Sequence, residues 1–299
     1  DQTKKAIAEG RLTHEMVAPI GVMDERVWQR LMLDMPIGAL LRNLGSLTEI
    51  GVSRVNRQKN LRHVESVLNN RDRLRKGRIH PIDVLKALKT YRSGGKLGRS
   101  KKTWEPVARI IDILEKALEM SFDTVPPTNK TFLHAVDVSG SMSYYSVSSV
   151  NLTCAEIATV MALVTAKAEK NYAIRGFSTS FKDLGITATD SFATAMEKTT
   201  LQNFGGTDAS SAYKWAIKHK FYADVICFWT DSESWKGTQP SQKLKEYRQK
   251  VNPNAKAIYV TLAPYQLTMV DPLDPNSWDF GGFDPAMPKI IQAIAIGDL

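Results

Sequence analysis

The sequence contains little cysteine, no long hydrophobic run and no recognisable leader. Two cysteines among 299 residues exclude a small secreted domain held together by disulfides. The densest apolar stretch, residues 154–168, is interrupted by Glu156 and Lys167, so we expect no membrane-spanning segment. The chain starts at Asp1, with neither a start methionine nor a signal peptide, and we therefore expect a processed or partial chain.

The signatures of common enzyme classes are also absent. The five histidines show no metal-binding spacing such as His-Glu-x-x-His, and there is no Gly-x-Ser-x-Gly nucleophile motif. Cys154 and Cys227 lie in apolar runs and are expected to be buried thiols. Asp137-Val-Ser139 lacks the second aspartate of haloacid-dehalogenase-type phosphatases, and His134 is expected to pack inside a strand. We therefore expect a protein that is not an enzyme.

Positive charge is abundant but unevenly distributed. The formal net charge of +9 comes entirely from residues 1–128, because residues 129–299 contain 16 basic and 16 acidic side chains. Residues 51–109 hold 17 basic and 4 acidic side chains. Such asymmetry favours a polyanionic partner, either nucleic acid or an anionic membrane. The alternative is a solvent-exposed helical surface with an excess of basic residues and no such partner.

Two segments concentrate this charge and supply the candidate RNA-binding residues. The first precedes Pro81, and the second is a glycine-rich segment expected to form a loop, which lacks the spacing of a phosphate-binding P-loop. Together they contribute nine candidates: Arg71, Arg73, Arg75, Lys76, Arg78, Lys96, Arg99, Lys101 and Lys102. Four aromatic residues are weighed either as base-stacking platforms or as packed side chains: Tyr91, Trp104, Tyr144 and Tyr145.

The first part of the chain has the apolar spacing of successive helices. Five are expected: one capped by Asp24 and ending before Pro36, one from Pro36 to Gly45, one around Leu61–Leu68, one from Pro81, and one capped by Thr103 that runs to Leu118. Short consecutive helices of this kind indicate an α-helical repeat array. Pro126-Pro127 marks the expected boundary between a helical domain, residues 1–125, and a second domain, residues 126–299.

The second part alternates strands with helices. Compact apolar runs at 131–137, 171–177, 223–231 and 255–263 are expected to be strands, and residues 208–220 a helix capped by Asp208. This alternation predicts an α/β doubly wound, mostly parallel sheet covered by helices on both faces.

Polar residues gather where these strands are expected to end. Asp137-Val-Ser139-Gly-Ser141 follows the first strand, a Gly-Gly-Thr207-Asp loop precedes a helix, and Asp231 follows a buried strand. Hydroxyl and carboxylate oxygens suit a hard divalent cation, with Mg²⁺ preferred and Mn²⁺ or Ca²⁺ as alternatives. In such sheets the carboxyl ends of strands lie along one edge, where ligands bind.

This arrangement resembles the metal-ion-dependent adhesion site of von Willebrand factor A domains. The resemblance assigns metal-binding roles to Asp137, Ser139, Ser141, Thr207 and Asp231. Four further segments resemble the Ro autoantigen (TROVE) family: 27–45, Arg78-Ile-His-Pro81, 246–250 and Gly281-Gly-Phe-Asp284. The resemblance covers nearly the whole chain and implies part of a ring of HEAT-like helical repeats followed by a von Willebrand factor A (Rossmann-like) domain.

The resemblance also implies a function. Family members are RNA chaperones that bind small Y RNAs and the ends of misfolded RNAs, so we expect a ribonucleoprotein component. We expect it to be a monomer in the cytoplasm, with the nucleus as a further location. It should have no membrane role and should bind a protein partner at the metal site. Several repeats of the family ring have no counterpart at the front of this chain. The alternative is an extracellular adhesion domain without an RNA role, which the Asn129 and Asn151 glycosylation sequons would fit.

Overall fold

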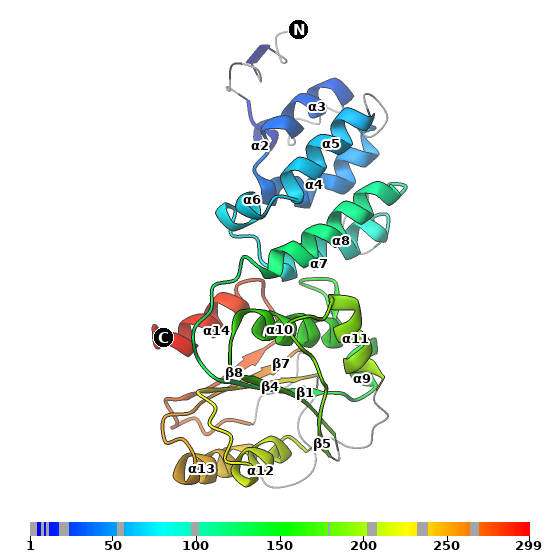
Figure 1. Ribbon diagram of the computed structural model, residues 1–299. Coiled ribbons are helices and arrows are strands. Elements are labelled where there is room, and N and C mark those ends of the chain that lie inside the picture. Colours follow the sequence, from blue (N-terminus) through cyan, green and yellow to red (C-terminus); the bar gives the residue numbers. More distant parts are fainter. Residues whose placement is uncertain are drawn as a thin grey trace. The chain divides into compact units, whose positions relative to one another are not determined.

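The computed structural model describes residues 5–6, 9, 12–17, 24–52, 57–96, 102–178, 180–201, 208–231, 239–263 and 269–299. The chain divides into two compact units, Asp1–Val125 and Pro126–Leu299 (Figure 1). We call them the helical unit and the sheet unit and describe each separately. The division falls where the sequence shows Pro126-Pro127.

The helical unit consists of short helices that bury apolar stripes against one another. They are α2 (His14–Val17), α3 (Glu25–Asp34), α4 (Ile37–Glu49), α5 (Arg57–Leu68), α6 (Arg71–Lys76), α7 (Pro81–Arg92) and α8 (Ala108–Phe122). Their starts follow local chemistry. The Asp24 carboxylate accepts hydrogen bonds from the first amides of α3, and α7 starts at Pro81 after a capping box between His80 and Asp83.

Two expected helix limits are wrong. Gly45 does not end a helix, because α4 continues through it to Glu49. A Cβ atom at Gly45 would lie 2.5 Å from the Trp104 ring, so glycine here permits a close approach rather than a helix end. Thr103 is not a cap either, because α8 starts five residues later, after Val107.

The sheet unit has a six-stranded sheet in the order β5-β4-β1-β6-β7-β8. The strands are β1 (Phe132–Asp137), β4 (Tyr172–Phe177), β5 (Phe181–Asp183), β6 (Val225–Thr230), β7 (Lys256–Thr261) and β8 (Ser277–Gly281). All neighbours pair in parallel except β4 and β5. A separate hairpin joins β2 (Ser146–Val147) to β3 (Leu152–Thr153). The doubly wound, mostly parallel sheet predicted from the sequence is therefore confirmed.

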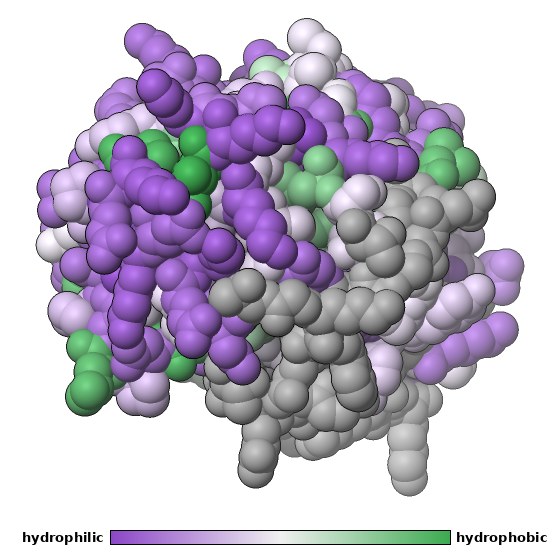
Figure 2. Space-filling model, turned by 90° about the horizontal axis from the view of Figure 1, so that it is seen from below, coloured by the Kyte–Doolittle hydropathy of each residue, from purple (hydrophilic) through white to green (hydrophobic). Residues whose placement is uncertain are grey.

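Helices cover both faces of this sheet (Figure 1). They are α9 (Ser141–Tyr144), α10 (Cys154–Ala168), α11 (Phe192–Thr200), α12 (Ser210–Lys218), α13 (Pro240–Lys250) and α14 (Met287–Ile296). One core cluster packs β1, β6 and β7 against α12 and α13 and includes the buried Tyr213, Phe228 and Tyr247. The outside of the α12–α13 layer is mostly hydrophilic, with isolated hydrophobic side chains (Figure 2), as expected for a layer whose inner side is buried.

Candidate metal centre and nucleic-acid interface

The candidate metal residues lie beside β1, the strand from which later strands are added in opposite directions along the sheet. From β1 the chain crosses to β4 on one side and later returns to β6 on the other side of β1. Asp137 is the last residue of β1, and Asp231 directly follows β6, which pairs with β1 in parallel. Both carboxylates therefore sit at the carboxyl edge of adjacent strands, where open α/β sheets bind their ligands.

Asp137 is fully buried and firmly held. Its Oδ2 accepts a hydrogen bond from Thr230 Oγ1 at 2.6 Å, and its Oδ1 accepts one from the Ser139 amide at 2.9 Å. Burial raises the pKa of Asp137 and the negative charge of Asp231 raises it further, while the hydrogen bonds act in the opposite direction. Asp137 thus lies in a fixed position, with a second carboxylate close enough to repel it.

Asp231 is 2 % exposed, and neither of its carboxylate oxygens has a hydrogen-bond partner within the described part of the chain. A buried carboxylate without a donor is costly, and a bound cation removes that cost. Ser139 lies in the loop after β1 and Ser141 is the first residue of α9, and their hydroxyl oxygens are 3.0 Å apart. Thr207, the fifth candidate, lies outside the described residues.

The donor set at this edge consists of carboxylate and hydroxyl oxygens. No group of three or more His, Cys, Asp and Glu residues that could hold a metal occurs among the described residues. The Cys154 thiol is buried and unsuited to ligation, because burial and then the charge of Asp231 raise its pKa to about 12. Hard oxygen donors beside an unpartnered carboxylate fit Mg²⁺ better than a soft metal.

The basic candidates of the first segment lie on and beside α6. Arg73, Arg75 and Lys76 are exposed, whereas Leu74 is fully buried and attaches the helix to the unit. Asn70 caps the helix by accepting a hydrogen bond from the Arg73 amide at 3.0 Å. The cations therefore face solvent on a short helix whose position is set by a cap and one apolar side chain.

The remaining basic candidates have varied surroundings. Arg78 is exposed, whereas Arg71 forms an ion pair with Asp123 at 2.8 Å. Lys96 lies beside a pocket, and Lys102 Nζ donates to Ser46 Oγ at 3.1 Å. The two other candidates, Arg99 and Lys101, lie outside the described residues.

Of the aromatic candidates, Tyr91 is a packed side chain and not a base-stacking platform. It is 2 % exposed, its hydroxyl lies 3.0 Å from Thr48 Oγ1, and it accepts a hydrogen bond from the Val107 amide. Tyr91 is therefore a core residue. Trp104 is partly exposed and lines the pocket beside Lys96, and Tyr144 is 88 % exposed next to the candidate metal loop.

Sequence reasoning missed several residues that the structure adds. Thr230 is not a candidate ligand by motif, yet its hydroxyl fixes Asp137. On α5, three exposed cations extend the basic surface: Arg57, Lys59 and Arg62. The apolar spacing of Leu61, Val64 and Leu68 is the available signal in the sequence, because it leaves Lys59 and Arg62 on the opposite side of the helix. Arg57 is exposed at the start of the helix.

Comparisons with known proteins agree with this architecture. The Ro60 vWA domain model matches residues 131–295 and the TROVE domain model matches residues 13–93. The RNA-binding protein RO60 of Deinococcus radiodurans is 37 % identical over 293 residues, which is 97 % of this chain and 55 % of that protein. The RNA-binding protein RO60 of Caenorhabditis elegans is 31 % identical over 297 residues, which is 98 % of this chain and 45 % of that protein.

The solved structures include one that matches both units. The crystal structure of the Deinococcus radiodurans RO (RSR) protein superimposes with a TM-score of 0.90 at 37 % identity, covering 98 % of this chain and 59 % of that one. The chain thus spans about half the length of the relatives it matches, and those relatives are named for RNA binding rather than for an enzymatic reaction. The sequence matches and the fold of both units therefore show that the chain belongs to the Ro60 family, with a TROVE-type helical region followed by a von Willebrand factor A domain.

Proposed function

We propose that this chain binds RNA through its basic helical unit and acts as a non-catalytic ribonucleoprotein component in the cytoplasm. Its expected ligands are small Y-type RNAs and the ends of misfolded RNAs, in RNA quality control. The observation that carries the proposal is the set of exposed cations on α5 and α6, in a chain whose relatives are named RNA-binding proteins. Exposed Lys and Arg side chains release counterions when they neutralise phosphates, which drives association.

Charge reversal at Arg73, Arg75 and Lys76 tests this proposal. Because each phosphate contact on a single strand contributes about 0.7 to the salt slope, the triple Glu variant should lose about 2 from that slope and bind at least about tenfold more weakly. Fluorescence anisotropy of a labelled single-stranded RNA across a salt series measures both quantities.

The matched control reverses three exposed cations of the A domain that have no ion pair among the described residues, namely Lys182, Lys218 and Lys289. This control should leave RNA affinity unchanged, and so should Asp137→Ala. Affinity that does not depend on salt, or equal losses in the two triple variants, would contradict the proposal and leave the metal-dependent adhesion function as the alternative.

We further propose that the A domain holds a divalent cation, with Mg²⁺ preferred, through Asp137, Ser139, Ser141, Thr207 and Asp231. The unpartnered, buried carboxylate of Asp231 supports this assignment. The cation would neutralise two adjacent carboxylates and present an open coordination position to an acidic group of a protein partner. Ser141 and Tyr144 are exposed beside it and would contact that partner.

Mg²⁺ should therefore stabilise the A domain. At a concentration 100 times the Kd, binding adds about 2.7 kcal/mol, or about 5 °C or more in Tm. Asp231→Asn should abolish this response and should raise the Tm in chelator, because it removes an unpaired buried charge. Differential scanning fluorimetry with and without chelator measures both effects.

Two serines of α9 provide a matched pair for this measurement. Ser141→Ala should weaken the Mg²⁺ response, whereas Ser143→Ala, an exposed hydroxyl two residues further along, should retain it. Equal Tm values with Mg²⁺ and with chelator in the parent chain would remove the metal site from the proposal.

A further inference from the structure

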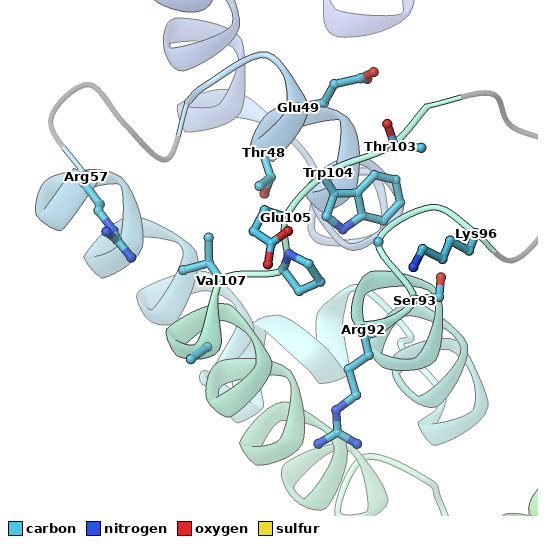
Figure 3. A pocket seen from close by; sticks show the side chains of 13 residues that line it. Thr48, Glu49, Arg57, Arg92, Ser93, Lys96, Thr103, Trp104, Glu105 and Val107 are labelled. Atoms are coloured by element: carbon cyan, nitrogen blue, oxygen red, sulfur yellow. The ribbon is translucent and has the colours of Figure 1, made fainter.

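A large open pocket in the helical unit has no role in the sites described above. It has a volume of about 1040 Å³ and is lined by the ends of α4 and α7, the start of α5 and the segment that leads into α8. Figure 3 shows the side chains that these four segments contribute to its lining. This volume exceeds that of a single nucleotide and is typical of pockets that bind small molecules.

The wall around Trp104 is rigid. The Trp104 indole donates a hydrogen bond to the Tyr91 carbonyl at 3.0 Å, and the two rings stack with centroids 6.0 Å apart. Gly45 and Gly95 approach the Trp104 ring so closely that a Cβ atom at either position would lie under 3 Å from it. The ring is therefore fixed by packing and by a hydrogen bond, and its remaining surface is held ready for a flat ligand.

Cations line the pocket, and two of them are available to a ligand. Arg92 extends away from Trp104 (Figure 3) and forms an ion pair with Glu115. Arg57 and Lys96 are exposed and have no ion pair among the described residues.

Two carboxylates also line the pocket. Glu49 and Glu105 line the pocket, are exposed and have no ion-pair partner within the described residues. Carboxylate oxygens only accept hydrogen bonds, so they suit a ligand edge with amino hydrogens and repel a carbonyl edge. A pocket with free cations, a fixed indole and acceptor carboxylates matches the three parts of a nucleotide: phosphate, base face and base amino group.

We propose that this pocket binds one nucleotide of single-stranded RNA, with the phosphate at Lys96, the base against Trp104 and its amino group donating to Glu105 or Glu49. The proposal deepens the RNA-binding function proposed above and rests on it. It adds a preference for cytosine over uracil, because cytosine presents an amino group where uracil presents a carbonyl oxygen.

Cytidine and uridine 5′-monophosphate are the matched probes, and isothermal titration calorimetry on the full chain is the measurement. We expect cytidine monophosphate to bind at least fivefold more tightly than uridine monophosphate, and inorganic phosphate to bind more weakly than either. Lys96→Gln should weaken both nucleotides about tenfold, as expected for the loss of a charged hydrogen bond. Lys59→Gln, at an exposed lysine of α5 that does not line the pocket, is the control and should leave both affinities unchanged.

The double variant Glu49→Gln/Glu105→Gln should remove the difference between the two nucleotides, because an amide can donate to uracil as well as accept from cytosine. Equal binding of both nucleotides by the parent chain, or no effect of Lys96→Gln, overturns the pocket assignment. The two proposals fail separately: RNA bound without any nucleotide binding refutes the pocket alone. The triple variant at Arg73, Arg75 and Lys76 should lose RNA and retain cytidine monophosphate.

Discussion

His134→Ala is expected to destabilise the A domain by about 3–5 kcal/mol, the range for a large buried ring replaced by a methyl group. His134 is 1 % exposed, and its ring stacks with those of Phe132 and Trp229. Its Nδ1 accepts a hydrogen bond from the Trp229 indole at 2.9 Å, so Nε2 carries the hydrogen and donates to Thr165 Oγ1 at 2.8 Å. The alanine variant leaves the Trp229 N–H buried without an acceptor as well as creating a cavity.

Urea denaturation followed by tryptophan fluorescence measures this loss. His219→Ala is the control, because His219 is exposed at the end of α12, and it should cost less than about 1 kcal/mol. Similar losses in the two variants would show that the buried network does not stabilise the domain.

The same network has a pH signature. Burial lowers the pKa of His134 to about 3, so the unfolded state, with its ordinary pKa of 6.5, binds more protons between these values. This contribution to stability is fully present above pH 6.5 and decreases as the pH falls, by up to about 1.4 kcal/mol per pH unit. His134→Gln should therefore show a shallower decline between pH 6 and pH 4 than the parent.

Arg248→Met is expected to cost about 3–5 kcal/mol, as when one partner of a buried ion pair is removed. Arg248 lies on α13 and donates to the Ala255 carbonyl at 2.9 Å, to the Asn276 carbonyl at 2.9 Å and to the Asp274 carboxylate at 2.5 Å. These bonds connect the helix with the segments before β7 and β8. Removing the guanidinium takes one donor from each of two carbonyls and removes the cationic partner of a largely buried carboxylate, which keeps its bonds from Ser277 and the Asn276 amide.

A surface pair on the same helix provides the comparison. Lys250 bonds Glu246 one turn away, but its side chain is 56 % exposed, so Lys250→Met should change the free energy of unfolding by less than about 0.5 kcal/mol. Arg248→Lys should recover only part of the loss, because an ammonium cannot reach three acceptors in the fixed geometry of a guanidinium. Equal losses of stability at Arg248 and Lys250 would show that the buried bonds of Arg248 stabilise the domain no more than an exposed ion pair does.

The four strands that sequence reasoning found are six-residue strands in the interior of the sheet, whereas the two that it missed are shorter edge strands; of the four, β4 is only partly buried. β1, β6 and β7 are nearly or fully buried runs of apolar residues, and such runs are recognisable without tertiary context. β8 is a half-buried edge strand with Asp279 at its centre, and β5 has three residues. The alternation in β8 is limited to Trp278-Asp279-Phe280 and β5 has one apolar residue, Phe181, so neither is long enough to be recognised as a strand from the sequence.

The candidate sites show the same limit. The motif was sufficient to predict that Asp137 and Asp231 lie at strand ends, and the structure adds that the two strands are neighbours. Tyr91 is the packed side chain that the sequence leaves as one of two possibilities, and Gly45 was misplaced, because the surroundings of both depend on Trp104 and Val107, which come from a distant segment. The pocket itself joins residues as far apart as Thr48 and Ala108, so no local pattern could indicate it.

The small size of α6 makes local unfolding of the basic surface easy. The helix has six residues and buries only Leu74, so its opening exposes one apolar side chain and needs little free energy compared with global unfolding. Its amides should exchange with solvent through local openings, far faster than those of the buried stripe of α8. Three of the cations proposed to meet RNA are thus attached to a segment that can unwind and reform around an irregular phosphate backbone while the rest of the unit stays folded.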